Sequence, residues 1–310
     1  MSTFDGIVKE FPRIRIDQFA RNGAPPLACF LSHVHSDHLR GLEGYKSPFV
    51  YCSAATKELL LRLEKYPHRM NFAKGILESR KQTYRHLKTL LRPIPLHTPT
   101  DIELAPGNVI RVTLFDAHHC TGAVMFLIEG QGKAILYTGD IRSEQWWIDN
   151  LVRHPCLISY AKGIKRLDNI YLDTTFASSS GPFKTFPPKA DGIAELLRKV
   201  SEYPSDTIFY FHAWTFGYEE VWVALANFLQ TRIHLDRYRY RLYRSLGESQ
   251  APDINDVAPL IGFQLGSAHS PGCLTHEDTG VRLHSCERGT RCHVFDNGKR
   301  QLGLECNAVC

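Results

Sequence analysis

Ser32-His33-Val34-His35-Ser36-Asp37-His38 is the stretch that decides the fold, because it places four metal-ligand side chains within six residues. It comes directly after an apolar run, residues 27–31, whose length fits a buried strand. In an extended chain residues two apart point the same way, so His33 and His35 can hold one ion. After a turn, Asp37 and His38 can face a second ion. Imidazole and carboxylate ligands together predict zinc or a similar divalent metal.

Two later strand ends add further ligand candidates. The segment Asp116-Ala117-His118-His119-Cys120-Thr121-Gly122 ends one predicted strand, and Tyr137-Thr138-Gly139-Asp140 ends the next strand but one. His118 and His119 compete for the role of third histidine, and we favour His119 because it precedes the Cys-Thr-Gly turn. The carboxylate of Asp140 can bridge two metals. Asp17, on the first alternating strand, can orient a ligand histidine through its ring N–H, although a surface carboxylate explains Asp17 nearly as well.

The predicted centre indicates a reaction. Two cations about 3.5–4 Å apart lower the pKa of a bridging water and clamp a phosphate for in-line attack. Asp37 would orient the nucleophile, and we predict Asp37, Asp140 and His119 as the catalytic set. The chemistry requires no serine or cysteine nucleophile. Hydrolysis of a phosphodiester is therefore the predicted reaction.

Length and composition limit the class of protein. The 310 residues suit two domains, and the chain is 43% hydrophobic and 22% charged, which is ordinary for a globular protein. No apolar run reaches the roughly 20 residues of a membrane helix, and the first residues lack a secretory signal. The nine cysteines then indicate reduced thiols or metal ligands. The net charge of +5 is too small to predict nucleic-acid binding by itself.

The coarse pattern predicts an α/β fold in two parts. The first part consists mainly of short strands, and a hairpin at Gly130-Gln131-Gly132 joins two of them. Its predicted strands are residues 13–17, 27–31, 109–115, 124–129, 134–137 and 169–173, with a helix at 56–63. The basic stretch 62–92 is predicted as a helical excursion.

A change in composition and in the pattern of predicted elements separates the second part from the first. Residues 178–182 and 187–188, rich in Ser, Gly and Pro, indicate a boundary or linker. Strands and helices then alternate, which predicts a smaller α/β domain with a largely parallel sheet. The predicted helices are residues 189–203, 218–230 and 236–246, and the predicted strands are residues 207–211, 232–235 and 281–284.

At these motifs the chain resembles the metallo-β-lactamase superfamily, and in particular its β-CASP branch of DNA-repair nucleases. The resemblance runs from residue 1 to about residue 295. Besides the histidine cluster and Gly139-Asp140, it rests on residues 14–19, 51–53, 56–60 and 119–126. The segments Tyr171-Leu172-Asp173-Thr174-Thr175-Phe176 and Gly217-Tyr218-Glu219 narrow it to the repair nucleases.

The resemblance implies a fold and an assignment of roles. The fold is an αββα metallo-β-lactamase sandwich over residues 1–177, with an inserted α/β β-CASP domain over residues 178–310. Asp173 falls on the carboxylate that marks the start of the β-CASP region, close to the ligands. The implied activity is 5′-to-3′ exonuclease or structure-selective endonuclease action on DNA ends and on single-strand/double-strand junctions. The implied location is the nucleus. The implied pathways are end joining and interstrand cross-link repair, with end-joining proteins as partners. The implied metal ligands are His33, His35, Asp37, His38, His119 and Asp140.

The chain departs from the family pattern at three places. It has His118 where Gly is usual and Thr121 where Pro is usual, and both changes look tolerable. Relatives continue beyond the insert, return to the first domain and supply a last active-site histidine, whereas the tail from about residue 295 to Cys310 resembles nothing in the family. We therefore expect a fragment, a misassembled reading frame or a truncated protein whose second metal lacks one ligand. Zinc is the expected metal, with Mg²⁺ or Mn²⁺ as alternatives at the second position.

A second metal site is predicted near the C-terminus. Two histidines and two cysteines make a closed tetrahedral zinc set, and relatives in the β-CASP branch have a similar arrangement. Buried thiols with a hydrogen-bonded histidine explain the pattern equally well, and His284 has the alternative role of a β-CASP histidine at the active centre. The proposed structural ligands are His234, His284, Cys286 and Cys292.

Two basic stretches are candidate DNA contacts. Residues 237–244 mix arginines with tyrosines, which could bind phosphates and stack unpaired bases, although a solvated helix explains them slightly better. A second stretch between Lys74 and Arg92 lies nearer the catalytic domain. The predicted DNA contacts are Lys81, Arg85, Lys88, Arg237, Arg239 and Arg241.

Three alternatives remain open from the sequence. A small-molecule hydrolase shares the histidine cluster, but the basic and aromatic stretches and the second domain oppose it. An RNA-processing nuclease is a closer alternative, since the same ions cut either backbone. A catalytically impaired DNA-binding relative is the third, because of the unusual C-terminal tail. None of the three requires a membrane.

Overall fold

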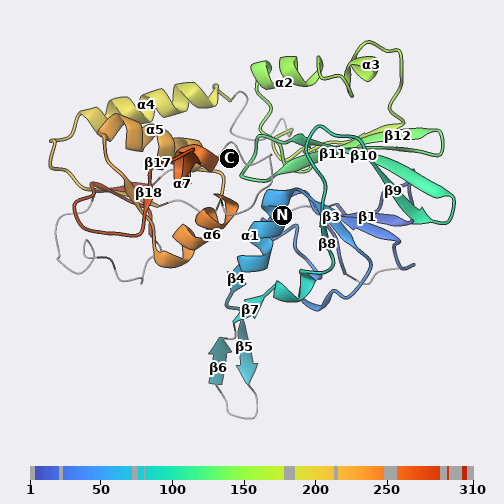
Figure 1. The fold of residues 1–310 in the computed structure, drawn as a ribbon, viewed down its shortest axis with the longest axis horizontal. Coiled ribbons are helices and arrows are strands. Elements are labelled where there is room, and N and C mark those ends of the chain that lie inside the picture. Colours follow the sequence, from blue (N-terminus) through green and yellow to red (C-terminus); the bar gives the residue numbers. More distant parts are fainter. Residues whose placement is uncertain are drawn as a thin grey trace. The chain divides into compact units, whose positions relative to one another are not determined.

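A computed structural model describes the backbone of residues 4–20, 24–71, 76–79, 81–177, 186–212, 216–247, 257–286, 292 and 302–305. The chain forms two compact units (Figure 1). The first unit contains Met1–His118 and Gly122–Asp173, and the second contains Thr174–Cys310 together with the short segment His119–Thr121. In the described part of the chain, no helix combines the length and the apolar character needed to cross a bilayer.

The first sheet of the first unit delivers the histidine cluster. It has the order β1-β2-β3-β8, and its strands are all parallel. β2 is buried along its whole length, as its run of apolar residues predicts, and the chain leaves it directly into the cluster. The strands are β1 (Ile14–Ile16), β2 (Ala28–Phe30), β3 (Val50–Cys52) and β8 (Leu91–Pro93).

The second sheet delivers the downstream ligand candidates. Its order is β13-β12-β11-β10-β9, with only β12 and β13 running parallel. Gln131 and Gly132 both have positive φ values, 52° and 73°, which fits the tight turn between β11 and β12. The strands are β9 (Thr100–Ala105), β10 (Asn108–Asp116), β11 (Val124–Gly130), β12 (Lys133–Tyr137) and β13 (Asn169–Tyr171).

The core of this unit lies between the two sheets. Phe30 of β2 and Phe126 of β11 are fully buried, and their rings contact edge to face at 5.5 Å. Alternating residues of β1 and β10 point into the same cluster, including Ile14 and Ile110. This face-to-face packing holds the ends of β2, β10 and β12, where the ligand candidates follow, in fixed positions.

Helices flank the two sheets. α1 (Ala54–Arg62) follows β3 and starts at Ser53, whose hydroxyl accepts a hydrogen bond from the amide of Thr56 at 3.1 Å. α2 (Gln145–Leu151) and α3 (Ile158–Ala161) lie between β12 and β13 in sequence. The short 3-10 helix η1 (Leu42–Gly44) follows the histidine cluster.

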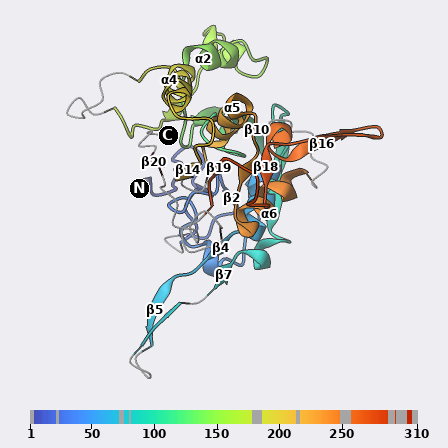
Figure 2. The same cartoon turned by 90° about the vertical axis from the view of Figure 1, so that its left-hand side faces the viewer.

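The predicted helical excursion at residues 62–92 is wrong. This stretch forms two antiparallel pairs, β4–β7 and β5–β6, followed by the 3-10 helix η2 (Arg85–Leu87). The β5–β6 hairpin extends away from the rest of its unit (Figures 1 and 2). The Lys, Arg and Leu residues favour helices, but Pro67 and Gly75 interrupt the stretch. The strands are β4 (Glu64–Lys65), β5 (His68–Asn71), β6 (Ile76–Ser79) and β7 (Gln82–Thr83).

The second unit has the parallel sheet that the alternating pattern predicts. The order is β18-β15-β19-β14-β20, and each described pair is parallel. The predicted helices correspond to α4 (Lys189–Ser201), α5 (Glu219–Leu229) and α6 (Arg237–Gly247). The strands of the sheet are β14 (Phe209–His212), β15 (Ile233–His234), β18 (Leu274–Thr275), β19 (Leu283–His284) and β20 (Leu302–Glu305).

Three further elements complete the described part of this unit. They are α7 (Ala258–Ile261) and the antiparallel hairpin of β16 (Gly262–Leu265) and β17 (Ala268–Pro271). Of the unfamiliar tail, residues 302–305 form the edge strand β20 beside β14, and residues 306–310 lie outside the described residues. The predicted linker at 178–182 also lies outside them. The mixed α/β class is thus correct, while the αββα and β-CASP assignments and the boundaries 1–177 and 178–310 stay predictions.

Candidate metal centre

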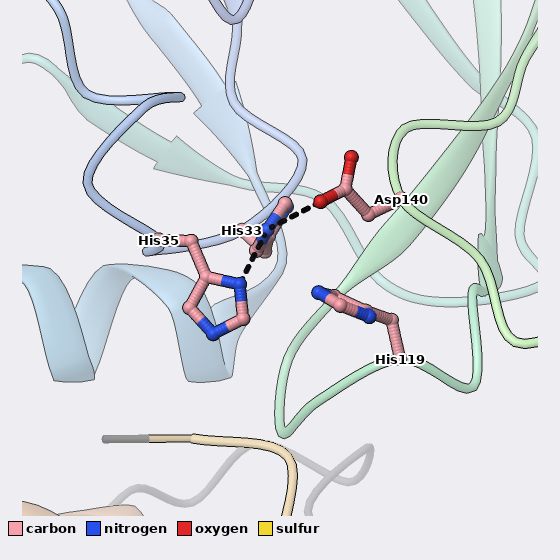
Figure 3. A group of neighbouring side chains, drawn as sticks. All are labelled: His33, His35, His119 and Asp140. Carbon is pink, nitrogen blue, oxygen red and sulfur yellow. Dashed lines mark hydrogen bonds and ion pairs between the residues drawn. The ribbon is translucent and has the colours of Figure 1, made fainter. Parts of the chain in front are cut away.

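Four of the predicted ligands converge on one point. His33, His35, His119 and Asp140 each offer a ligand atom, and these atoms all lie within 4.8 Å of one another (Figure 3). His33 Nε2 lies 3.0 Å from His35 Nδ1 and 3.7 Å from Asp140 Oδ2. Nitrogens held by one ion at about 2.0–2.1 Å stand about this far apart. The donor set therefore fits a zinc-type cation.

Of the other two predicted ligands, His38 lies near the second oxygen of Asp140, and Asp37 lies near His38. His38 Nε2 is 3.3 Å from Asp140 Oδ1 and 3.9 Å from Asp37 Oδ2. One oxygen of Asp140 thus faces His33 and the other faces His38. The carboxylate stands where a ligand shared by two cations would stand.

A buried nitrogen supports the fit of a second cation. His38 is 1% exposed, and its Nε2 makes no hydrogen bond to any described residue despite the nearby carboxylates. Burying such an atom without a partner costs free energy. Burial lowers the pKa of His38, but the carboxylates of Asp17 and Asp140 outweigh it and raise the pKa to about 10. The position therefore favours a positive charge, which a divalent cation can supply in place of the proton.

Asp17 orients two of the candidate ligand histidines through the ring nitrogens that face away from the cluster. It is only 6% exposed. Its Oδ2 accepts hydrogen bonds from His38 Nδ1 at 2.9 Å and from the Ser32 hydroxyl at 2.6 Å. Ser32 Oγ in turn lies 2.9 Å from His33 Nδ1. Both histidines therefore direct Nε2 towards the cluster, as a carboxylate behind a metal ligand would ensure.

Two residues that sequence reasoning missed complete this network. The amide of Ser32 donates to Asp17 Oδ1 at 2.7 Å, and the Tyr137 hydroxyl donates to Asp17 Oδ2 at 2.9 Å. Burial and the Asp17 carboxylate raise the pKa of Tyr137 well above its usual value, so the phenol remains a donor. Tyr137 stands at the end of β12, within the Tyr-Thr-Gly-Asp motif, and that position was the available signal.

The turn that carries His119 is anchored to the start of α1. Gly122 O accepts hydrogen bonds from Ser53 Oγ at 2.7 Å and from Thr56 Oγ1 at 2.8 Å. Gly122 has φ +84°, and a Cβ there would stand 2.9 Å from the amide of Thr56. The close approach requires glycine. Ser53 and Thr56 belong to a motif of the resemblance, but only the fold assigns them this contact.

Two further residues named from the sequence, His118 and Asp173, have contacts close in the chain to the candidate ligands His119 and Asp140. His118 has a left-handed backbone, φ 54°, and its ring contacts Trp146, whereas the group of ligand atoms within 4.8 Å contains His119. Asp173 accepts a hydrogen bond at 3.3 Å from the amide of Ile141, the residue after Asp140. Its amide lies 3.0 Å from the hydroxyl of Thr138. Asp173 therefore supports the loop that carries Asp140.

A second cluster lies in the second unit. His234, His284 and Cys292 are buried and offer ligand atoms within 4.8 Å of one another. The two Nδ1 atoms are 3.2 Å apart, and Cys292 Sγ lies 3.7 Å and 3.5 Å from them. His284 Nε2 lies 3.2 Å from the carbonyl of Val281, which leaves Nδ1 as the acceptor that faces the cluster. Cys286 is buried and packs beside Cys292 in an apolar cluster.

The predicted DNA contacts differ in their surroundings. Lys81 is paired with Glu64 at 2.5 Å, and Arg239 is largely buried, donating to Ser285 O at 3.1 Å. These two side chains therefore have structural contacts. Lys74 and Arg80 lie outside the described residues. The predicted contacts Arg85, Lys88, Arg237 and Arg241 are exposed.

The fold and the site define a class of protein. A two-sheet unit with a His-x-His-x-Asp-His cluster and further ligands at neighbouring strand ends belongs to the metallo-β-lactamase type. Residues 27–160 match the family model described as anti-Pycsar protein Apyc1. A protein of unknown function from Enterococcus faecalis V583 is similar in structure, with a TM-score of 0.50 at 16% identity, over 86% of this chain and 60% of that one.

Curated relatives identify the chain more narrowly. Protein artemis is 34% identical in Homo sapiens and 32% identical in Rattus norvegicus, in each case over 255 residues, 76% of this chain and 33% of the relative. The 5′ exonuclease Apollo of Rattus norvegicus is 30% identical over 258 residues, 83% of this chain and 42% of the relative. The chain is a divergent, Artemis-like homologue among the metallo-β-lactamase/β-CASP proteins. It spans about a third of the length of the Artemis proteins.

This result confirms the resemblance to the β-CASP branch of the metallo-β-lactamase superfamily that the sequence indicated. Three of the motifs that indicated this resemblance lie together in the structure: the histidine cluster, the His119 turn and the segment after β12.

Proposed function

We propose that the protein is a metal-dependent nuclease that hydrolyses phosphodiester bonds of DNA. The observation that carries the proposal is Asp140, whose two oxygens face two separate groups of ligand side chains. Divalent cations held there would supply activation of water and neutralise charge on the scissile phosphate. Zinc suits the nitrogen-rich group, and Mg²⁺ or Mn²⁺ suits the position of Asp37, His38 and Asp140.

The residues of the chain have distinct parts in this proposal. His33, His35, His119 and Asp140 would bind one cation, and Asp37, His38 and Asp140 the other. Asp37, about a third exposed, would accept a hydrogen bond from the attacking water and aim it at phosphorus. Asp17 and Tyr137, buried behind the ligands, would keep the imidazoles in the orientation that binding needs.

The relatives support DNA as the substrate class. One relative is named as a 5′ exonuclease, which supports 5′-to-3′ exonuclease action here, with structure-selective endonuclease action as the alternative. The same likeness supports a nuclear protein that acts on DNA ends and junctions. It also supports a part in end joining and interstrand cross-link repair, with end-joining proteins as partners. An RNA-processing nuclease and a DNA-binding relative without activity are the competing proposals.

A cleavage assay tests the function. Purified protein, with zinc, Mg²⁺ or Mn²⁺ added, is incubated with a 5′-phosphorylated, 3′-labelled DNA strand, its hairpin form and an RNA of the same sequence. We expect metal-dependent cleavage of DNA that falls by at least about 100-fold in Asp37→Ala, because the variant loses a ligand and a water acceptor. The assay uses Asp101→Ala as control, since Asp101 is an exposed carboxylate of β9. Cleavage that survives in Asp37→Ala contradicts the mechanism, and preference for RNA contradicts the substrate.

We also propose a structural zinc in the second unit. His234, His284 and Cys292 provide three buried donors of the type that zinc prefers, and Cys286 is the proposed fourth. Both described ring nitrogens of His284 have neighbours within this unit. We therefore assign His284 to this site in preference to the active centre.

A further inference from the structure

An exposed tryptophan lies in the segment that follows the candidate ligand Asp140 in the sequence. Trp146, at the start of α2, is 52% exposed, whereas its neighbour Trp147 is 8% exposed and donates its indole N–H to the carbonyl of Asp116. Trp146 follows Asp140 by only six residues. Its ring contacts His118, the sequence neighbour of the candidate ligand His119, and indole rings are more often buried by packing or by a partner than left half open to solvent.

Several contacts fix the orientation of the Trp146 ring. Its Nε1 donates to Glu144 Oε2 at 3.0 Å. The Glu144 side chain is only 10% exposed, and its other oxygen lies 3.4 Å from Arg142 Nε. The ring of His118 meets the indole edge to face, with centroids 4.9 Å apart and an interplanar angle of 85°. The indole is therefore held in place before any ligand arrives.

The same loops carry this ring pair and the ligands. The amide of Arg142 donates to the carbonyl of Ala117 at 3.2 Å, which ties the segment after Asp140 to the segment before His119. His118 has a left-handed φ of 54°, so successive side chains diverge. The ring of His119 joins the ligand group, and the ring of His118 contacts Trp146.

We propose that Trp146, supported by His118, is a stacking platform for an unpaired nucleobase next to the scissile phosphodiester. The proposal rests on the nuclease function. Bases within a duplex have both faces covered by their neighbours, so away from the terminal pair an exposed indole can stack only on an unpaired, frayed or extruded base. Because its N–H is already engaged by Glu144, the indole offers a π-face and no donor for reading base edges. The platform therefore selects single-stranded character and tolerates any base sequence.

Binding without cleavage provides the test. The protein, with its metals retained and with Asp37→Ala as a common background that prevents cleavage, is titrated into a fluorescein-labelled single-stranded DNA 12-mer and into a blunt duplex of the same sequence. Removing one base stack weakens binding by about 5- to 100-fold, and this is the loss of single-strand affinity that we expect in Trp146→Ala. Trp146→Phe keeps a stacking ring and should bind within about threefold of wild type. Ile148→Ala, 38% exposed on the same helix, controls for the integrity of α2 and should bind as wild type.

A set of 12-mers, each with one abasic nucleotide, identifies the partner of the ring. At the position that stacks on Trp146, the abasic strand binds wild-type protein as weakly as the intact strand binds Trp146→Ala, and the two losses are not additive. Single-strand binding by Trp146→Ala that equals wild type overturns the platform, and so does an equal loss for the duplex. A strand-specific loss, when protein with Asp37 intact cleaves no nucleic acid with any metal, leaves the platform standing and rejects the nuclease function.

Discussion

At the scale of single residues, one carboxylate organises the candidate centre. Asp17 accepts four hydrogen bonds, two from Ser32 and one each from His38 and Tyr137. It does so from a left-handed backbone, φ 54°, which costs free energy in a residue other than glycine. The four hydrogen bonds together hold the backbone of Asp17 in this strained conformation. The same hydrogen bonds position the candidate ligands.

Asp17→Asn tests this role. The variant keeps the shape but loses the negative charge and one acceptor oxygen, so the ring of His38 loses the partner that fixes its orientation. We expect the affinity for zinc at the first unit to fall by about 10- to 100-fold, measured by competition with a chromophoric chelator. Asp168→Asn is the matched control, because Asp168 accepts a backbone hydrogen bond from Ala134 away from the ligands. Equal zinc affinities in wild type and Asp17→Asn would remove Asp17 from the centre.

The ligand candidates were predictable from sequence because they are close together or stand at strand ends. Among the supporting contacts, the hydrogen bond between Asp17 and a ligand histidine was also predictable, but the others were not. Tyr137 lies 120 residues from Asp17, and Ser53 lies 69 residues from Gly122. Neither pairing has a local pattern, since each exists only because two sheets pack face to face.

At the scale of elements, α6 separates exposed arginines from a structural one. Arg237, Arg241 and Arg244 are exposed and spaced i, i+4 and i+7, so they share one face of the helix. They span about 10 Å, roughly three phosphates of one strand. Arg239 points elsewhere and contacts Asp236 and Ser285. The helix was predictable, but its exposed face was not, because charge alone does not show which arginine has a partner in the fold.

A double charge reversal examines the exposed face of α6. Arg237→Glu/Arg241→Glu should weaken binding of all DNA sequences alike and flatten the dependence of log affinity on log salt by about 1.4 to 1.8, as measured by fluorescence anisotropy at several salt concentrations. Arg239→Ala, in contrast, should lower the thermal midpoint while leaving the salt dependence unchanged. A salt dependence that does not differ between wild type and the double variant would show that this face is merely solvated.

The misassigned stretch at residues 62–92 has a physical lesson. Its residues favour a helix locally, yet Glu64 and Lys65 of β4 pair with Thr83 and Gln82 of β7 in an antiparallel ladder. Strand pairing between distant segments outweighed a weak local preference. Where period and composition agreed, as in α5 and the turn between β11 and β12, the predictions matched the fold.

At the scale of the whole molecule, the described residues contain two separate groups of metal-type ligands, one built around the histidine cluster and one in the parallel sheet of the second unit. The histidine cluster and the alternating elements predicted both parts. The strand β20, within the unfamiliar tail, was not predicted. A short strand at a sheet edge forms because it pairs with a neighbouring strand, here β14, and its own sequence pattern is too short to indicate it.

Removing a ligand from the second cluster should act on folding and not on chemistry. Cys292→Ser keeps nearly the same volume but is a poor zinc ligand, so we expect one zinc fewer per chain and a lower thermal midpoint, because the free energy of metal binding contributes to stability. Elemental analysis and calorimetry measure the two effects. Cys156→Ser, at a half-buried thiol, serves as control. An unchanged zinc count in Cys292→Ser and in His284→Ala would exclude a structural zinc.

The position of Asp17 and Asp140 has a consequence for how metal enters the first centre. Asp17 contacts His38 directly and His33 through Ser32, and Asp140 faces both histidines. In the proposed two-cation centre, the first cation would hold Asp140 in place but would also repel a second positive charge close to it. The two positions should therefore fill at different metal concentrations, so that a half-filled form precedes the doubly filled one in a zinc titration.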